Sequence, residues 1–427
     1  LPVAEIIRDP VVVVTSEQEA GVHPAPIPRP PLIFGPDRRN SEGLALEERH
    51  VRDALLASMG TTLRDAFAVG PLVAGKPMEV GGPKRELLCP HDRRRSLGTV
   101  VEATPALADE AAEKATGAHK SWDALGGEKR AEILEKTAAL YERDRAALMA
   151  VMVREAGKTL DNALGDVREA VDFLRYYANE ARRLFSRPME LPGPTGEKNE
   201  MRLAGRGPFA CISPWNFPLA IFTGQVSAAL GAGNPVLAKP AEQTPLTAHL
   251  ATRLFHEAGV PEDVLQLLPG GGDVGAALVA NEQVRGIAFT GSNDTASRIQ
   301  QSLARRLRGI VPFIAETGGI NAMIVDSTAL PEQVTRDVLR SAFDSAGQRC
   351  SAARVLLVPD DVADNIREML TGAAACHKIG DPIDSATHVG PVIDQDAHER
   401  LEAHKARRSR DAKAVLFDAP LHADCRH

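Results

Sequence analysis

Two side chains in the second half of the chain have the chemistry of a covalent catalyst and its base. Cys350 lies in the run FDSAGQRCSAARVLLV, where small residues predict a turn and the apolar residues after them predict a strand. A thiol exposed at such a turn can attack a carbonyl carbon. The ordinary alternative is burial, because a free cysteine commonly packs as a small apolar residue. Glu316, in VPFIAETGG, ends another strand pattern and could be a general base or only an exposed loop glutamate.

An amide between two prolines could complete this set. Asn216 lies in PWNFP, directly after the apolar run PFACIS. An asparagine at this place can simply turn or cap the chain. Held by a rigid loop, its amide could instead donate a hydrogen bond to the oxyanion that forms when a nucleophile adds to a carbonyl. Thiol, carboxylate and amide each lie next to a predicted strand.

Three further segments could bind a nucleotide. Lys239 and Glu242 follow the run PVLAK and could form a surface ion pair or hold ribose hydroxyls. In the second case the Glu242 carboxylate would repel a 2′-phosphate, which favours NAD over NADP. The turn at Ser292, in TGSNDTASRI, leads into a predicted helix whose first N–H groups can hold a phosphate. No GxGxxG follows the first strand, and PGGGDVG, with Gly272 and Gly275, predicts an ordinary turn that could also admit an adenine.

The order of elements that must position these residues predicts the fold class. After residue 207, short apolar strands alternate with helices, which is typical of βαβ units around a parallel sheet in an α/β fold. Ligands of such sheets bind beyond the carboxyl ends of the strands. Strands are predicted at 208–213, 235–239, 264–268, 284–289, 311–315, 321–325 and 354–358. Helices are predicted at 219–232, 243–258, 293–306, 332–346 and 362–374.

The first hundred residues have a different character and are expected to be irregular. The run GVHPAPIPRPPLIFGP has six prolines in sixteen residues, which favours an extended polyproline-like connector. From about residue 107, apolar residues at three- and four-residue spacing predict helices over 106–125 and 129–157. A third helix follows a break at Gly157, with one apolar face from Leu160 to Leu174.

Composition excludes several classes of protein. The 427 residues, 44% hydrophobic and 25% charged, are typical of a globular protein of two or three domains. The formal net charge of -7 comes without a long basic block, so no nucleic-acid partner is expected. No apolar run approaches the ~20 residues of a membrane span and no export pattern begins the chain, which predicts a cytoplasmic protein. The five cysteines and twelve histidines are scattered, so neither a disulfide framework nor a metal site is predicted.

Five motifs, PWNFP, KPAEQTP, FTGS, ETGG and GQRC, resemble the aldehyde dehydrogenase superfamily in their order and separation. Longer runs, among them VPFIAETGGINAMIVDSTALPEQV, are similar to the L-glutamate-γ-semialdehyde dehydrogenase half of bifunctional proline utilization A. The resemblance extends from about residue 30 to the end and is most specific over 206–395. It implies a linker and N-terminal arm at 1–95, a Rossmann-type NAD domain at 96–314 and a second α/β catalytic domain at 315–427, incomplete at its C-terminus.

The resemblance also implies a role for each candidate residue. It makes Cys350 the nucleophile, Glu316 the base that activates water, Asn216 an oxyanion donor and Ser351 a ligand of the substrate carboxylate. FAD is implied only for a proline dehydrogenase half that this chain lacks. The implied NAD contacts are Ile212, Ser213, Pro214, Trp215, Lys239, Glu242, Gly272, Gly275, Phe289, Thr290, Gly291, Ser292, Thr317 and Gly318.

The implied reaction is the NAD-dependent oxidation of L-glutamate γ-semialdehyde to L-glutamate, through a thioester, in proline catabolism. A small aldehyde is then the partner, and a homo-oligomer is implied for the parent enzyme but is doubtful for this chain. Ile320 departs from the family, which normally has Gln or Lys after ETGG. The chain also stops before a Glu-x-Phe-Gly-Pro segment and a substrate loop, so we expect a fragment of a two-activity enzyme.

Three alternatives remain open at this point. The chain could bind NAD without turnover, because the family's last segments are missing. It could also be an aldehyde dehydrogenase of another substrate specificity. A cofactor-independent cysteine hydrolase is disfavoured, because no nearby motif supplies the histidine that a hydrolytic thiol usually needs.

Overall fold

The computed structural model describes residues 2–19, 28–64, 66–76, 80–307 and 309–411. The chain forms two units, Leu1–Glu42 and Gly43–His427. The first unit contains the helices α1 (Val3–Ile6) and α2 (Pro10–Glu19). Part of the predicted proline-rich connector, residues 21–27, lies outside the described residues. Its continuation is not extended, because Pro30–Leu32 form a 3-10 turn that begins with the fixed backbone angle of proline.

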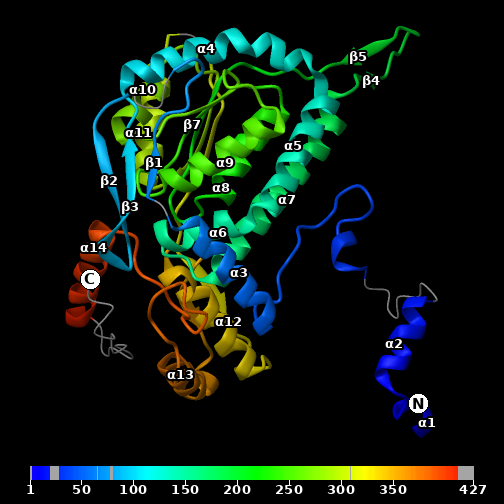
Figure 1. The fold of residues 1–427 in the computed structure, drawn as a ribbon, viewed down its shortest axis with the longest axis vertical. Helices are drawn as coiled ribbons and strands as arrows, with labels where there is room; N and C mark the ends of the chain where they lie inside the picture. Colours follow the sequence, from blue (N-terminus) through cyan, green and yellow to red (C-terminus); the bar gives the residue numbers. More distant parts are fainter. Residues whose placement is uncertain (1, 20–27, 65, 77–79, 308, 412–427) are drawn as a thin grey trace. The chain divides into compact units, whose positions relative to one another are not determined.

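The second unit is built on a five-stranded parallel sheet with the strand order β10-β9-β6-β7-β8 (Figure 1). The predicted strands at these places and the predicted α/β fold class are confirmed. Short strands of four to six mostly buried residues need apolar side chains on both faces. The apolar runs in the sequence therefore predicted where such strands lie. The strands are β6 (Phe209–Ile212), β7 (Val236–Lys239), β8 (Leu265–Leu267), β9 (Gly286–Gly291) and β10 (Phe313–Thr317).

Helices cover both faces of this sheet, and successive residues of each strand point to opposite sides. On β6, Phe209 and Cys211 belong to one apolar cluster, whereas Ala210 and Ile212 belong to another. The first cluster joins the sheet to α5 (Gly126–Arg143), α7 (Leu160–Phe185), α8 (Ala220–Gly231) and α9 (Pro245–Ala258). The second joins it to α4 (Pro105–Ala124), α10 (Gly272–Ala280) and α11 (Asn293–Ala304).

The helical region before the sheet differs from its prediction at one point. The segment 129–157 is not one helix, because α5 ends at Arg143 and α6 (Arg145–Glu155) begins after Asp144. Asp144 has backbone angles of φ -98 and ψ 18, outside the helical range. The predicted break at Gly157 is confirmed, since this residue has φ +66, which favours glycine. The predicted apolar face of α7 is also confirmed, because Leu160 and Leu174 are buried.

The segment before residue 107 is structured, so the expectation of an irregular region is wrong for most of it. It contains α3 (Arg49–Thr62) and a sheet of three strands, β1 (Phe67–Val69), β2 (Lys84–Cys89) and β3 (Asp92–Val101). Gly98 allows β1 and β3 to approach, because a Cβ there would lie 1.9 Å from the Phe67 carbonyl oxygen. Polar residues on the exposed positions of β2 and β3 concealed the strand pattern.

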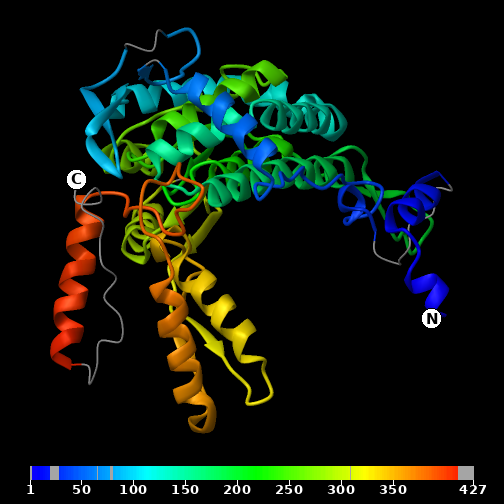
Figure 2. The same ribbon diagram turned by 60° about the horizontal axis from the view of Figure 1, so that its bottom comes forward.

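A smaller lobe follows β10 in the chain. It contains the parallel pair β11 (Asn321–Ile324) and β12 (Ala353–Leu357) with the helices α12 (Pro331–Phe343) and α13 (Asp360–Ala375). These strands and helices confirm their predictions, and Figure 2 shows α12 (yellow) and α13 (orange) side by side. The hairpin β4 (Met189–Leu191) and β5 (Asn199–Met201) and the helices α10 and α14 (Gln395–Asp411) were not predicted.

Two absences apply to the described part of the chain. None of its helices is both long and apolar enough to cross a bilayer. Within the same residues, no group of three or more His, Cys, Asp or Glu side chains could hold a metal ion. The domain boundaries near 95 and 314 remain a prediction.

Candidate active site

The order of the strands reverses between β6 and β9. The chain runs from β6 outward through β7 to β8, and then crosses back to β9 and β10 on the other side of β6. Ligands of open parallel sheets bind at such a reversal, beyond the carboxyl ends of the strands. The last residue of β6, Ile212, pairs with Phe289 of β9, so the predicted contacts at 212–215 and 289–292 lie on either side of the reversal.

Gln225 on α8 joins these two strand ends and was missed by the sequence analysis. Its side-chain Nε2 donates to the Ile212 carbonyl at 3.3 Å and to Thr290 Oγ1 at 3.1 Å. The Gln225 Oε1 atom and the hydroxyl of Ser213 are buried with no hydrogen-bond partner among the described residues. A single glutamine in the apolar helix AIFTGQVSAALG was the available signal.

Lys239 is buried at the end of β7, so the surface ion-pair alternative is wrong for it. Its ammonium group donates to the carbonyls of Pro240 at 2.8 Å and Gly270 at 2.7 Å. Burial lowers the pKa of Lys239. A Cβ at Gly275 would lie 3.4 Å from the Lys239 stem, so the structure brings these two predicted residues together. The Glu242 side chain is exposed.

Two helix N-termini lie at predicted phosphate or adenine sites. The segment PGGGDVG is not an ordinary turn, because α10 begins at Gly272. Gly270, Gly272 and Gly275 have GxGxxG spacing, but they follow β8 rather than the first strand. Ser292 caps α11, and its hydroxyl oxygen accepts from the Thr295 N–H at 3.2 Å. Because α11 follows β9, its first N–H groups lie at the strand-order reversal.

Glu316 lies within β10, which continues to Thr317. In the sheet Glu316 pairs with Thr290, and Thr317 pairs with Gly291. The Glu316 side chain is exposed. The structure therefore places the candidate base on the strand next to the predicted cofactor contacts.

The loop before Cys350 has an unusual backbone. After α12 it forms a 3-10 turn over Asp344–Gly347, in which Ser345 has φ 54 and Ala346 has φ 57. Non-glycine residues rarely adopt these left-handed angles, and they persist only where neighbouring contacts fix them. Cys350 itself is exposed, so the burial alternative is wrong. We call residues 344–350 the nucleophile loop.

Gln348 supplies the contacts that fix this loop. Its side chain donates to the Ser345 carbonyl at 2.9 Å and to the Pro391 carbonyl at 3.2 Å. Its Oε1 accepts from the Ile393 N–H at 2.9 Å. No local sequence pattern indicates this role of Gln348, because Pro391 and Ile393 lie more than forty residues away in the chain.

Two asparagines join the nucleophile loop to the sheets. Asn216 Nδ2 donates to the Gln348 carbonyl at 3.0 Å, two residues before the thiol. Asn321, at the start of β11, donates to the Cys350 carbonyl at 2.6 Å. The amide of Asn216 carries two hydrogens, so this bond leaves one donor for another group. The structure therefore joins Asn216 to the loop that contains Cys350.

A charged cavity of about 1140 Å³ lies beside the loop. Arg349, the neighbour of Cys350, lines it, and the Arg349 guanidinium donates to Asn162 and lies 5.6 Å from the Phe217 ring. Lys158 lies 4.5 Å from the same ring and 3.0 Å from Asp166. Both signs of charge are therefore present around one aromatic side chain. Ser351 is exposed next to the thiol.

The left-handed angle of Ala346 predicts an unusual effect of glycine. Ala346→Gly is expected to raise the free energy of unfolding by about 1 kcal/mol, because glycine adopts φ 57 without strain. Chemical denaturation measures this change. The control Ala373→Gly, inside α13, should instead lower stability by roughly 0.5–1 kcal/mol. A loss of stability in Ala346→Gly would contradict the backbone described here.

Comparison with known proteins decides the family. The model of the aldehyde dehydrogenase family matches residues 79–426. The chain belongs to the aldehyde dehydrogenase family. Bifunctional protein PutA of Klebsiella aerogenes is 46% identical to this aldehyde dehydrogenase over 412 residues, which are 95% of this chain and 30% of PutA. The chain thus spans less than a third of that relative's length.

Shorter relatives match over most of their length. The 1-pyrroline-5-carboxylate dehydrogenase of Geobacillus thermodenitrificans is 35% identical over 82% of this aldehyde dehydrogenase and 68% of its own chain. A Thermus 1-pyrroline-5-carboxylate dehydrogenase with bound NAD superposes with a TM-score of 0.86 at 32% identity, covering 90% of this chain and 75% of that chain. These matches confirm the resemblance described above.

Proposed function

We propose that this aldehyde dehydrogenase oxidises L-glutamate γ-semialdehyde to L-glutamate with NAD, as a step of proline catabolism. The observation that carries the proposal is the exposed Cys350 thiol, on a loop that Asn216 joins to the carboxyl end of β6. The names of the PutA and 1-pyrroline-5-carboxylate dehydrogenase relatives support the substrate, and the NAD in the Thermus protein supports the cofactor.

The residues at the strand-order reversal fit a dinucleotide. Ser213 Oγ and Gln225 Oε1 are buried polar atoms without a described partner, and a ligand hydroxyl or amide could bind them. The α11 N-terminus behind Ser292 could bind the pyrophosphate. Exposed Glu242 could bind a ribose hydroxyl and would repel a 2′-phosphate. We propose the remaining contacts at Ile212, Pro214, Trp215, Lys239, Gly272, Gly275, Phe289, Thr290, Gly291, Thr317 and Gly318.

Each of three side chains, Cys350, Asn216 and Glu316, then has a separate role in the reaction. The Cys350 thiolate adds to the aldehyde carbon, and the Asn216 amide and the Cys350 N–H stabilise the oxyanion, at about 2.7–4 kcal/mol per donor. NAD, when bound, accepts the hydride and leaves an acyl group on the Cys350 sulfur. Glu316 takes a proton from water, which hydrolyses the thioester to a carboxylate.

The cavity beside Arg349 is suited to an amino-acid aldehyde. The substrate has an α-carboxylate and an α-ammonium group, and the cavity contains the cation Arg349 and the anion Glu169. We propose that the exposed Ser351 also donates to the carboxylate. 1-Pyrroline-5-carboxylate itself is a cyclic imine, and addition of water opens it to the aldehyde that a thiol can attack.

NADH formation tests this proposal. The chain is mixed with NAD and either L-glutamate γ-semialdehyde or butyraldehyde, which has a similar carbon chain without charges. We expect NADH from both aldehydes and a kcat/KM at least tenfold higher for the semialdehyde, because a site that pairs a charged group rejects an analogue that lacks it. Equal values would contradict the substrate, and NAD binding without NADH would contradict the activity.

A further inference from the structure

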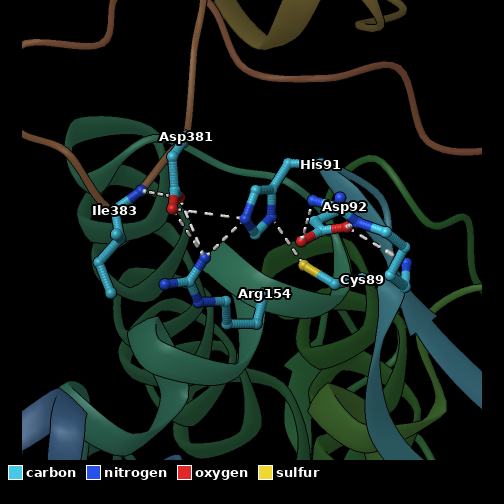
Figure 3. Close-up of polar contacts among 7 residues, drawn as sticks. Cys89, His91, Asp92, Arg154, Asp381 and Ile383 are labelled. Carbon is cyan, nitrogen blue, oxygen red and sulfur yellow. Dashed lines mark hydrogen bonds and ion pairs between the residues drawn. The ribbon is translucent and has the colours of Figure 1, made fainter. Parts of the chain in front are cut away.

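Three segments that are far apart in the sequence meet at Asp381 (Figure 3). Arg154, at the end of α6, donates from Nη1 to both Asp381 carboxylate oxygens, at 3.0 and 3.2 Å. His91, in the turn between β2 and β3, places Nε2 3.4 Å from the same carboxylate. The N–H of Ile383 also donates to it, at 3.0 Å. We call Arg154, His91 and Asp381 the anchor cluster.

Two members of the anchor cluster are largely withdrawn from water, whereas the side chain of Asp381 is 41% exposed. The side chain of Arg154 is 7% exposed and that of His91 is 14% exposed. Burial alone lowers the pKa of His91, but the hydrogen bonds and charges of Asp381 and Cys89 outweigh it and raise this pKa to about 9. Cys89 Sγ lies 2.7 Å from His91 Nδ1 and is buried in an apolar cluster, so it fixes the ring. Asp381 thus pairs with the buried Arg154 cation, whose Nη1 also lies 3.0 Å from His91 Nε2, and a buried cation that loses its charge partner costs considerable stability.

The segment that carries Asp381 also holds the nucleophile loop. The Gly380 N–H donates to the Val389 carbonyl at 3.2 Å and Ile379 forms an isolated parallel bridge with Val389, so the segment 376–394 folds back on itself. Two residues beyond Val389, the Pro391 carbonyl accepts from the Gln348 side chain. Pro391 in turn packs on Gly157, where a Cβ would lie 2.6 Å from its ring. The segment is therefore attached to the end of α6 at two points, Arg154 and Gly157.

We propose that Arg154 and Asp381 are positioning residues for the Cys350 thiol. Their ion pair attaches residues 376–394 to α6, this segment holds Gln348, and Gln348 fixes the left-handed backbone before Cys350. Gln348 also presents the carbonyl that accepts from Asn216. The inference rests on the proposed role of Cys350 as the nucleophile.

The same segment offers a matched control. Lys378 and Asp384 form an ion pair at 2.6 Å, with side chains 52% and 46% exposed. Such a surface pair contributes little, and its two residues both lie within the segment. Asp384→Asn therefore removes one carboxylate from the segment without releasing it from α6.

The test compares Asp381→Asn with Asp384→Asn in the full chain. The readouts are kcat and KM for NADH formation, Tm, and the rate at which iodoacetamide alkylates the exposed Cys350 thiol, with added glutathione as the reference thiol. We expect Asp381→Asn to lower kcat roughly ten- to a hundredfold, with a smaller change in KM for NAD, because a displaced thiol reacts less often. The alkylation rate of Cys350 relative to glutathione should change at least threefold, and Asp381→Glu should restore part of both effects. Asp384→Asn should change neither.

Distinct outcomes would overturn the inference. If Asp381→Asn lowers only Tm, or changes kcat and alkylation no more than Asp384→Asn does, then the anchor cluster has a structural role alone. Should Asp381→Asn fail to fold, Arg154→Gln removes the cation that pairs with Asp381 and leaves a polar side chain, and unchanged alkylation in that variant would contradict positioning. If the unaltered chain forms no NADH, the proposed function fails, whereas the alkylation rates still decide the inference.

Discussion

The Cys350→Ser variant is expected to form NADH from L-glutamate γ-semialdehyde at least about 10³-fold more slowly than the unaltered chain. A serine hydroxyl is a much weaker nucleophile than a thiol at neutral pH, unless an adjacent base activates it. NAD affinity should not change, because none of the proposed cofactor contacts lies in the nucleophile loop. Steady-state NADH formation and calorimetric NAD binding measure the two effects separately.

Cys376→Ser is the matched control for this prediction. Cys376 is also an exposed free thiol, but it follows α13 rather than the nucleophile loop. The control should retain the full rate. Substantial activity in Cys350→Ser, or an equal loss in Cys376→Ser, would contradict the assignment of the nucleophile.

Glu316→Gln is expected to separate the two halves of the reaction. A fast burst of NADH, approaching one equivalent per chain, should be followed by turnover that is roughly 10²- to 10⁴-fold slower than in the unaltered chain. The burst persists because hydride transfer precedes thioester hydrolysis, and only hydrolysis needs the Glu316 carboxylate. Rapid-mixing absorbance measures both phases.

Glu262→Gln removes another exposed carboxylate, in the loop before β8, and should leave both phases unchanged. Loss of the burst in Glu316→Gln would show that Glu316 acts before hydride transfer, for example on the thiol. Glu316 would then still belong to the active site, but it would act in an earlier step than thioester hydrolysis.

The sequence predicted those parts of the fold that depend on local pattern. The strands β6 to β9 were found because their buried positions require continuous apolar runs, whereas the more exposed β10 to β12 were found because short apolar runs are also present in their sequences. The position of the candidate cofactor contacts could be predicted in the same way. The carboxyl ends of parallel strands lie at one edge of a sheet, and this arrangement places Ile212 beside Phe289. The family motifs then agreed with this placement.

Other features depend on contacts that no local pattern shows. Asn216 and Gln348 are joined across 132 residues, and Arg154 and Asp381 across 227. The buried state of Lys239 depends on the Gly270 carbonyl, which comes from another loop. Helix α10 was missed because three consecutive glycines stand at its start, and β2 because two of its exposed positions, Lys84 and Glu86, are charged.

The central claim is a thioester on Cys350, and its direct test is the mass of the peptide that contains this residue. Glu316→Gln is mixed with NAD and L-glutamate γ-semialdehyde and quenched in acid, which keeps the α-amine protonated and prevents cyclisation. We predict that the Cys350 peptide gains the mass of one glutamyl acyl group, in an amount equal to the NADH burst. An unmodified Cys350 peptide alongside NADH, or the same group on another cysteine, would contradict the account.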